Sequence, residues 1–149
     1  MKLLRNTALP IVLAGVWISL SEFLRNEIIA KTYWVEHFQS LGLTFPSEPI
    51  NGVFWVLWSL LFAAAVYMLS QRFSLLETTL LAWYVGFILM WVVVWNLNVL
   101  PLDLLLIAFP LSLLETFLAA WIIHKLSRAP SRSSRDETSP SDTGFQHID

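Results

Sequence analysis

The sequence predicts an all-α integral membrane protein: a four-helix transmembrane bundle with an extracytoplasmic interfacial helix and a disordered cytoplasmic tail. Hydrophobic residues occupy 56% of the 149 positions, charged residues occupy 13%, and the mean hydropathy is +0.64. The 72 residues at positions 52–123 carry only four formal charges, which are Arg72, Glu77, Asp103 and Glu115. Because lipid offers the backbone no hydrogen-bonding partner, segments of this composition cross the bilayer as helices.

Short polar joints divide the chain into apolar blocks, each close to the ~20 residues that cross a hydrocarbon core. We expect a membrane domain over residues 1–125, with spans at 7–24, 52–70, 75–96 and 102–124. Asn51 is placed to cap the second span, and Ser74 with Glu77 forms a Ser-x-x-Glu capping box at the start of the third. The alternative for the first block is a secretory signal peptide that is later cleaved, and the sequence leaves this open.

Basic residues indicate the orientation of the spans. Of the nine lysines and arginines, only Arg25 and Lys31 fall on one side of the predicted membrane. The seven on the other side are Lys2, Arg5, Arg72, Lys125, Arg128, Arg132 and Arg135. The positive-inside rule therefore predicts that both termini are cytoplasmic, and the setting we expect is a bacterial inner membrane.

The segment between the first two spans is too long for a simple turn. It keeps helical character over about residues 26–41, and Gly42 offers a C-terminal stop. Ala30, Trp34 and Phe38 share one helical face, which predicts an interfacial helix lying on the outer leaflet or capping the bundle. At the other end of the chain, residues 126–149 are rich in serine, proline and charge, which predicts a disordered tail.

Each predicted span has a face of small or polar residues, which is how helices approach one another in lipid. We expect these faces to point inward. They comprise Gly15 and Ser19; Ser59 and Ala63; Thr78, Ala82 and Gly86; and Ala108, Ser112 and Ala119. Trp17 and Trp83 lie deeper in the predicted hydrocarbon region than the other tryptophans.

Glu115 is the principal candidate for a functional residue because it lies near the middle of the fourth span, on the same face as Ser112. The functional interpretation is a proton-binding carboxyl or a site for a cationic substrate. The structural interpretation begins with Pro110, which removes a backbone donor and predicts a kink or break in this span. Ser112 and Glu115 would then cap the restarted helix as a second Ser-x-x-Glu box.

A repeated decapeptide supports the capping interpretation. SLLETTLLAW at residues 74–83 recurs as SLLETFLAAW at residues 112–121, with eight of ten positions identical. The two copies run in opposite directions through the predicted membrane, so a structural repeat is doubtful, and one capping motif used twice is the simpler explanation. A helix broken at Pro110 would equally be typical of a membrane binding site.

Three further polar residues are candidates for a site. Glu22 can meet Arg25 at i+3 and Asn26 at i+4, either as a local ion pair or as part of an outward-facing pocket under the interfacial helix. His37 falls on the apolar face of that helix, where a histidine bonded to the bundle competes with a ligand or a pH switch. The candidate proton or ligand site therefore comprises Glu115, Ser112, Glu22, Arg25 and His37.

Several chemistries find no support in the residues. Cysteine is absent, which excludes disulfides and thiolate sites. The three histidines fall in different regions, so we expect no metal site and no cofactor. No basic patch points to nucleic acid, and we see no glycine-rich phosphate loop or serine nucleophile motif.

Two functional hypotheses follow. The first is a non-catalytic membrane scaffold or accessory subunit that acts through helix contacts, with the lipid bilayer and a second copy or another membrane protein as partners. The alternative is a small oligomeric proton-coupled carrier that uses Glu115 near the bilayer midplane, with Glu22 and Arg25 at its outer mouth. An enzyme acting on lipophilic substrates is a third class that no residue pattern supports.

Overall fold

The computed structural model describes residues 4–127, with side chains described from residue 6 onward. Over this range the fold is all-α and contains four helices long and apolar enough to cross a membrane. They are Asn6–Ile29, Pro49–Ser70, Leu75–Asn96 and Leu102–Ser127. The predicted helical membrane fold is therefore confirmed, whereas the predicted tail lies outside the described residues beyond its first two positions.

The first long helix is α1 (Leu9–Phe23) with π-helical turns at both ends, η1 (Leu4–Ala8) and η2 (Leu24–Ile29). It therefore continues past the expected end at residue 24 and includes Arg25. A break at Ala30 separates it from α2 (Lys31–Ser40), and Gly42 follows with a positive φ of 71°, the left-handed conformation that favours glycine.

The second long helix, α3, spans Pro49–Ser70. Its N-cap is Glu48, so Asn51 lies inside the helix and the prediction that Asn51 is the cap was wrong. Pro49 explains the earlier start, because proline at the first helical position has no N–H to satisfy and a φ suited to the helix.

The third long helix consists of α4 (Leu75–Trp83), the π-helical η3 (Tyr84–Ile88) and α5 (Leu89–Asn96). Ser74 accepts a hydrogen bond from the Glu77 backbone N–H, and the Glu77 carboxylate accepts one from the Ser74 N–H, which confirms the predicted capping box. A tight turn over residues 71–74 connects this helix to α3.

The fourth long helix begins with a 3₁₀ turn, η4 (Leu102–Leu104), and continues as α6 (Leu105–Ser127). Pro110 lies inside α6 without ending it, so the predicted break in this span was wrong. Proline is more frequent inside membrane helices than inside soluble ones, and α6 continues through this one on its exposed face.

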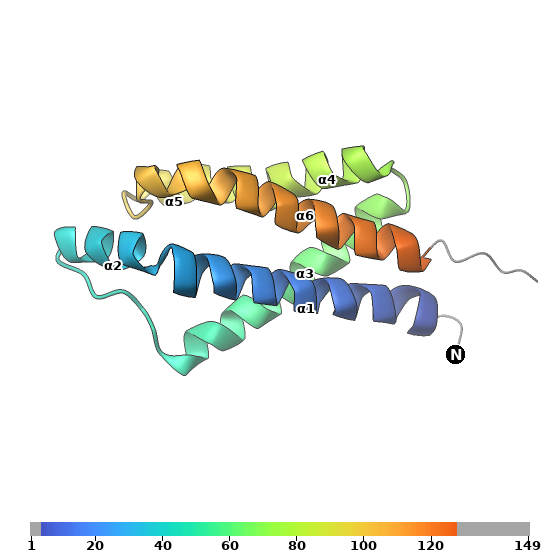
Figure 1. The fold of residues 1–149 in the computed structure, drawn as a ribbon, viewed down its shortest axis with the longest axis horizontal. Coiled ribbons are helices and arrows are strands. Elements are labelled where there is room, and N and C mark those ends of the chain that lie inside the picture. Colours follow the sequence, from blue (N-terminus) through green and yellow to red (C-terminus); the bar gives the residue numbers. More distant parts are fainter. Residues whose placement is uncertain (1–3, 128–149) are drawn as a thin grey trace, which may run out of the picture.

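Helix α1 packs against α3 and α6, and α4 packs against α6 and α3. In Figure 1, α1 and α6 run side by side, their Leu9 and Ser127 ends lie at the same end of the bundle, and α2 lies at the other. The buried core is built largely from small residues, as expected of helices that associate in lipid. Eight of the ten predicted small or polar face residues are buried: Gly15, Ser59, Ala63, Thr78, Ala82, Ala108, Ser112 and Ala119.

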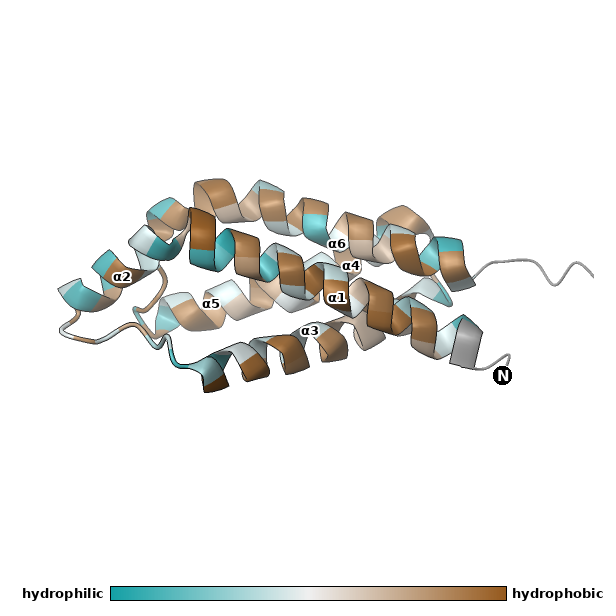
Figure 2. Ribbon diagram, turned by 60° about the horizontal axis from the view of Figure 1, so that its bottom comes forward, coloured by the Kyte–Doolittle hydropathy of each residue, from teal (hydrophilic) through white to brown (hydrophobic). Residues whose placement is uncertain are grey.

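The outer surfaces of the long helices are apolar. Figure 2 shows brown, hydrophobic ribbon over most of α1, α3 and α6, whereas hydrophilic colour gathers on α2 and the connecting turns. Exposed Leu20, Leu61 and Leu106 lie on these surfaces, which would be unfavourable in water and suit hydrocarbon. The candidate spans thus imply contact with a lipid bilayer.

Candidate functional site

Three charged side chains meet inside the bundle: Glu22 from α1, Arg25 from η2 and Glu115 from α6. Their residue exposures are 3%, 5% and 1%. The Arg25 Nη1 atom donates to Glu115 Oε2 at 2.9 Å, and its Nη2 atom donates to Glu22 Oε1. We call these residues the charge cluster.

The predicted helical spacing accounts for half of this arrangement. Glu22 pairs with Arg25 one turn on, and Asn26 Nδ2 donates to Glu22 Oε2 at 2.6 Å, as i+3 and i+4 neighbours should. Both residues are buried in the bundle, and the first helix continues beyond them to Ile29.

Glu115 turns toward the first helix. Its Oε2 accepts hydrogen bonds from Ser21 Oγ and from Arg25, both at 2.9 Å, and its backbone carbonyl accepts one from Trp17 Nε1 at 3.0 Å. The carboxyl therefore joins α6 to the first helix and does not cap a restarted helix. Its Oε1 atom is buried with no hydrogen-bonding partner among the described residues.

Arg25 also has an aromatic neighbour. Its guanidinium carbon lies 5.1 Å from the centroid of the Phe87 ring, which is fully buried. A guanidinium over an aromatic face gains a cation–π interaction that is stronger when water is excluded. Arg25 belongs to η2 and Phe87 to η3, so two π-helical segments meet at the cluster, and such segments frequently mark functional sites.

Ser112 is separate from the charge cluster, although both sites use α6. Its hydroxyl donates to the Phe109 carbonyl at 3.1 Å and accepts from Trp83 Nε1 at 2.9 Å. The two copies of the repeated decapeptide therefore use serine differently, because Ser74 caps a helix end whereas Ser112 binds the tryptophan of the other copy.

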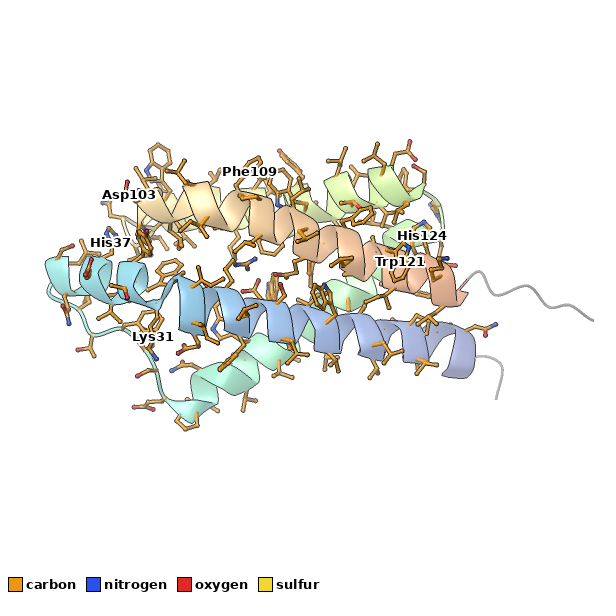
Figure 3. All side chains as sticks on the ribbon, in the orientation of Figure 1. Lys31, His37, Asp103, Phe109, Trp121 and His124 are labelled. Carbon is orange, nitrogen blue, oxygen red and sulfur yellow. The ribbon has the colours of Figure 1, made fainter. Side chains whose placement is uncertain are left out.

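His37 also lies outside the charge cluster. Its Nε2 atom lies 3.0 Å from the Asn98 carbonyl oxygen, which ties α2 to the turn before η4. Figure 3 shows His37 and Asp103 at the α2 end of the bundle and His124 at the opposite end. Within residues 4–127, no group of three histidine, aspartate or glutamate side chains could hold a metal ion.

Several neighbours of the cluster were not predicted from the sequence. Trp17 and Ser21 lie two turns and one turn before Arg25 on the first helix, so their i−8 and i−4 spacing from Arg25 was a usable signal. Phe87 belongs to another helix, and no spacing along the chain indicates it. Trp34 of α2 donates to Asn26 Oδ1 at 3.1 Å and extends the hydrogen-bond network to the end of the bundle.

A charge at the centre of a bilayer costs about 2.5 to 3.5 kcal/mol on insertion scales. Pairing lowers this cost, but two carboxylates and one guanidinium leave the cluster with a net charge of −1 when all are ionised. The arrangement can therefore join helices, and it can also accept one positive charge.

Comparisons with protein-family models, with curated proteins and with solved structures find no significant match to this chain.

Proposed function

We propose that this protein is a small membrane scaffold or accessory subunit that acts by helix contacts. The observation that supports it most directly is an apolar groove of about 500 Å³ on the surface that would face lipid. One wall is α3 and the other is η3 with α5. The lining residues are Trp58, Leu61, Phe62, Val85, Gly86, Leu89, Met90, Val93 and Val94.

The groove follows from how α3 crosses its neighbours. In Figure 1, α3 runs obliquely to α4 and α5, and its contacts with the third long helix are made mainly with α4. Phe62 can lie close to η3 because Gly86 has no side chain; a Cβ atom there would be 2.5 Å from the ring. The helices are therefore held together at Gly86 and diverge beyond it.

We infer that the occupant is an apolar transmembrane helix of a different membrane protein. The wall formed by residues 85–94 extends about 14 Å at 1.5 Å per residue, enough for more than two turns of a partner helix. All lining residues are uncharged, so the partner face is expected to lack charge. In a symmetric dimer of this chain the two grooves would face each other, and neither would be filled by a helix. This argues against a second copy as the occupant.

Photocrosslinking in native membranes tests this proposal. A photoreactive amino acid at Val93 lies in the groove, and the same group at Val92, of similar exposure but outside the lining, is the control. We expect cross-links from position 93 alone to an apolar span of one partner protein, with Val93→Trp preventing co-purification and Val92→Trp leaving it intact. Adducts with lipid only, with a second copy, or equally from both positions would reject it.

The charge cluster supports a second candidate, the proton-coupled carrier. The unpartnered Oε1 of buried Glu115 is the observation that favours it. Purified protein in liposomes, compared with Glu115→Gln, tests this function by proton and cation flux. Equal flux in both, or flux in neither, would remove the carrier candidate.

We also propose that both termini are cytoplasmic in a bacterial inner membrane. Burial of Arg25 inside the bundle removes it from the outer loops, which leaves only Lys31 there against seven basic residues on the other side. Tag accessibility in right-side-out vesicles tests the orientation, and a tag accessible at either terminus from outside would contradict it.

A further inference from the structure

We propose that the charge cluster is a proton-binding site and that Glu115 is the carboxyl that takes up and releases the proton. The inference deepens the second candidate function, but it does not require transport, because a buried carboxyl can bind a proton without carrying it across. The reaction is the addition of H⁺ to a carboxylate oxygen, with no redox step or other group involved.

Hydrogen bonding distinguishes the two carboxyls. Both oxygens of Glu22 accept hydrogen bonds, Oε1 from Arg25 and Oε2 from Asn26 at 2.6 Å. Glu115 is bonded only through Oε2, and Oε1 has no donor among the described residues. Hydrogen bonds to both oxygens favour the ionised form of a carboxyl, and Glu22 has them, whereas Glu115 has one oxygen without a donor.

The charge balance of the cluster also identifies Glu115 as the proton-binding residue. The Glu22 and Arg25 pair is neutral by itself, so an ionised Glu115 would add a net negative charge to the interior of the bundle. Among the described residues, no other charged group is bonded to the cluster. α3 has no charged residue, and the third long helix has only Glu77, which is bonded to Ser74 at the end of α4. On the first and fourth helices, Glu27 pairs with Lys31, Lys125 lies over Trp121, and Asp103 lies in η4 at the far end of its helix. Phe87 and Trp17 approach without charge. A proton on Glu115 makes the cluster neutral.

The same geometry selects a proton over a metal cation. The Arg25 guanidinium is 2.9 Å from Oε2 and repels a metal ion, which would keep positive charge beside it, whereas a proton only neutralises the carboxylate. A metal ion also requires several oxygen ligands, whereas one free carboxyl oxygen is available here. A proton needs only that one oxygen.

The carboxyl is one hydrogen bond from a less buried group. Ser21, whose hydroxyl donates to Oε2, is only half-buried, whereas Glu115 is 1% exposed. Ser21 therefore links the Glu115 carboxyl to a less buried position on the first helix.

Difference infrared spectroscopy of the purified full chain tests the inference, because a protonated carboxyl has a C=O stretch that an ionised one lacks. At neutral pH we expect this band in the wild type, its loss in Glu115→Gln, and its disappearance as the pH is raised. In Glu22→Gln the Arg25 and Glu115 pair is neutral with Glu115 ionised, so the band should weaken or be lost there too. Glu77→Gln is the matched control, since Glu77 is an exposed capping residue. Glu115→Asp keeps an acid at the site and should retain the band at a shifted frequency, which covers the case in which Glu115→Gln does not fold.

Absence of the band in the folded wild type at neutral pH would overturn the proposal. Retention of the band in Glu115→Gln would also overturn it, as would an unshifted band in Glu115→Asp or displacement of the band by added Na⁺ at constant pH. A normal band in a protein without flux would reject only the carrier function, so the two failures are distinguishable.

Discussion

Arg25 and Glu115, 90 positions apart in the chain, are joined by a hydrogen bond of 2.9 Å between Nη1 and Oε2 inside the bundle. This bond links the first and fourth membrane helices. It also combines two residues that the sequence presented as separate candidates, one near an interface and one near the bilayer midplane.

Replacing Arg25 should destabilise the fold strongly. Arg25→Met leaves Glu22 and Glu115 buried without their shared cation, and breaking a buried pair in this way costs about 3 to 5 kcal/mol. Lys31→Met is the control, because Lys31 and Glu27 form an exposed i,i+4 pair whose loss costs at most about 0.5 kcal/mol. The free energy of unfolding in mixed detergent measures both, and equal losses would contradict the structural role of the cluster.

The glycines of α3 and η3 should respond oppositely to alanine. In Gly86→Ala the new methyl group meets the Phe62 ring, and overpacking of this kind costs about 1 to 3 kcal/mol. Gly52 has open space around its position in α3, so Gly52→Ala should stabilise the helix by about 0.5 to 1 kcal/mol. The free energy of unfolding in mixed detergent should fall in Gly86→Ala and rise in Gly52→Ala. An unchanged value in Gly86→Ala would show that α3 is not held against η3 there.

The two serines of the repeated decapeptide should differ in their coupling to Trp83. A double-mutant cycle of Ser112→Ala with Trp83→Phe should give about 0.6 kcal/mol, with an upper bound of about 1.7 kcal/mol, the range for hydrogen bonds between membrane helices. Ser74→Ala should cost about 0.5 to 2 kcal/mol as a lost cap and show no coupling to Trp83. Coupling to Ser74 but not to Ser112 would reverse the assignment.

Helix α2 should detach when its anchor is removed. Trp34 bonds Asn26 and packs with buried Ala30 and Leu104, so Trp34→Ala should speed amide hydrogen exchange across residues 31–40. Tyr33→Ala is the matched control, since Tyr33 is 38% exposed on the same helix. Unchanged exchange in Trp34→Ala would mean that other contacts hold α2.

The fold could be predicted from the sequence because each part depended on local pattern. Apolar length defined the spans, Ser74 and Glu77 defined a helix start, and Gly42 marked a stop. The errors at Asn51 and Pro110 have different causes. Pro49 is a local helix-start signal that lies before Asn51 and was overlooked, whereas α6 continues through Pro110 although proline disfavours a helix interior.

The site was only partly predictable, for a related reason. Glu22 with Arg25 follows from helical spacing, and Glu115 is conspicuous as a lone carboxyl in an apolar span. Their meeting depends on how far the first helix extends and on how it packs against α6, which no local spacing contains. Phe87, whose only sequence signal is that it is aromatic, could not be identified before the helices were placed.

Solid-state NMR of the protein in lipid tests the central claim most directly, through the distance between the Arg25 guanidinium nitrogens and the Glu115 carboxyl carbon. The structure predicts a direct-contact correlation between these groups. In Glu115→Gln the carboxyl signal should be replaced by that of a side-chain amide, and its contact with Arg25 should remain. No correlation in wild-type protein, with the Glu22 contact to Arg25 still present, would contradict the buried link between the first and fourth helices.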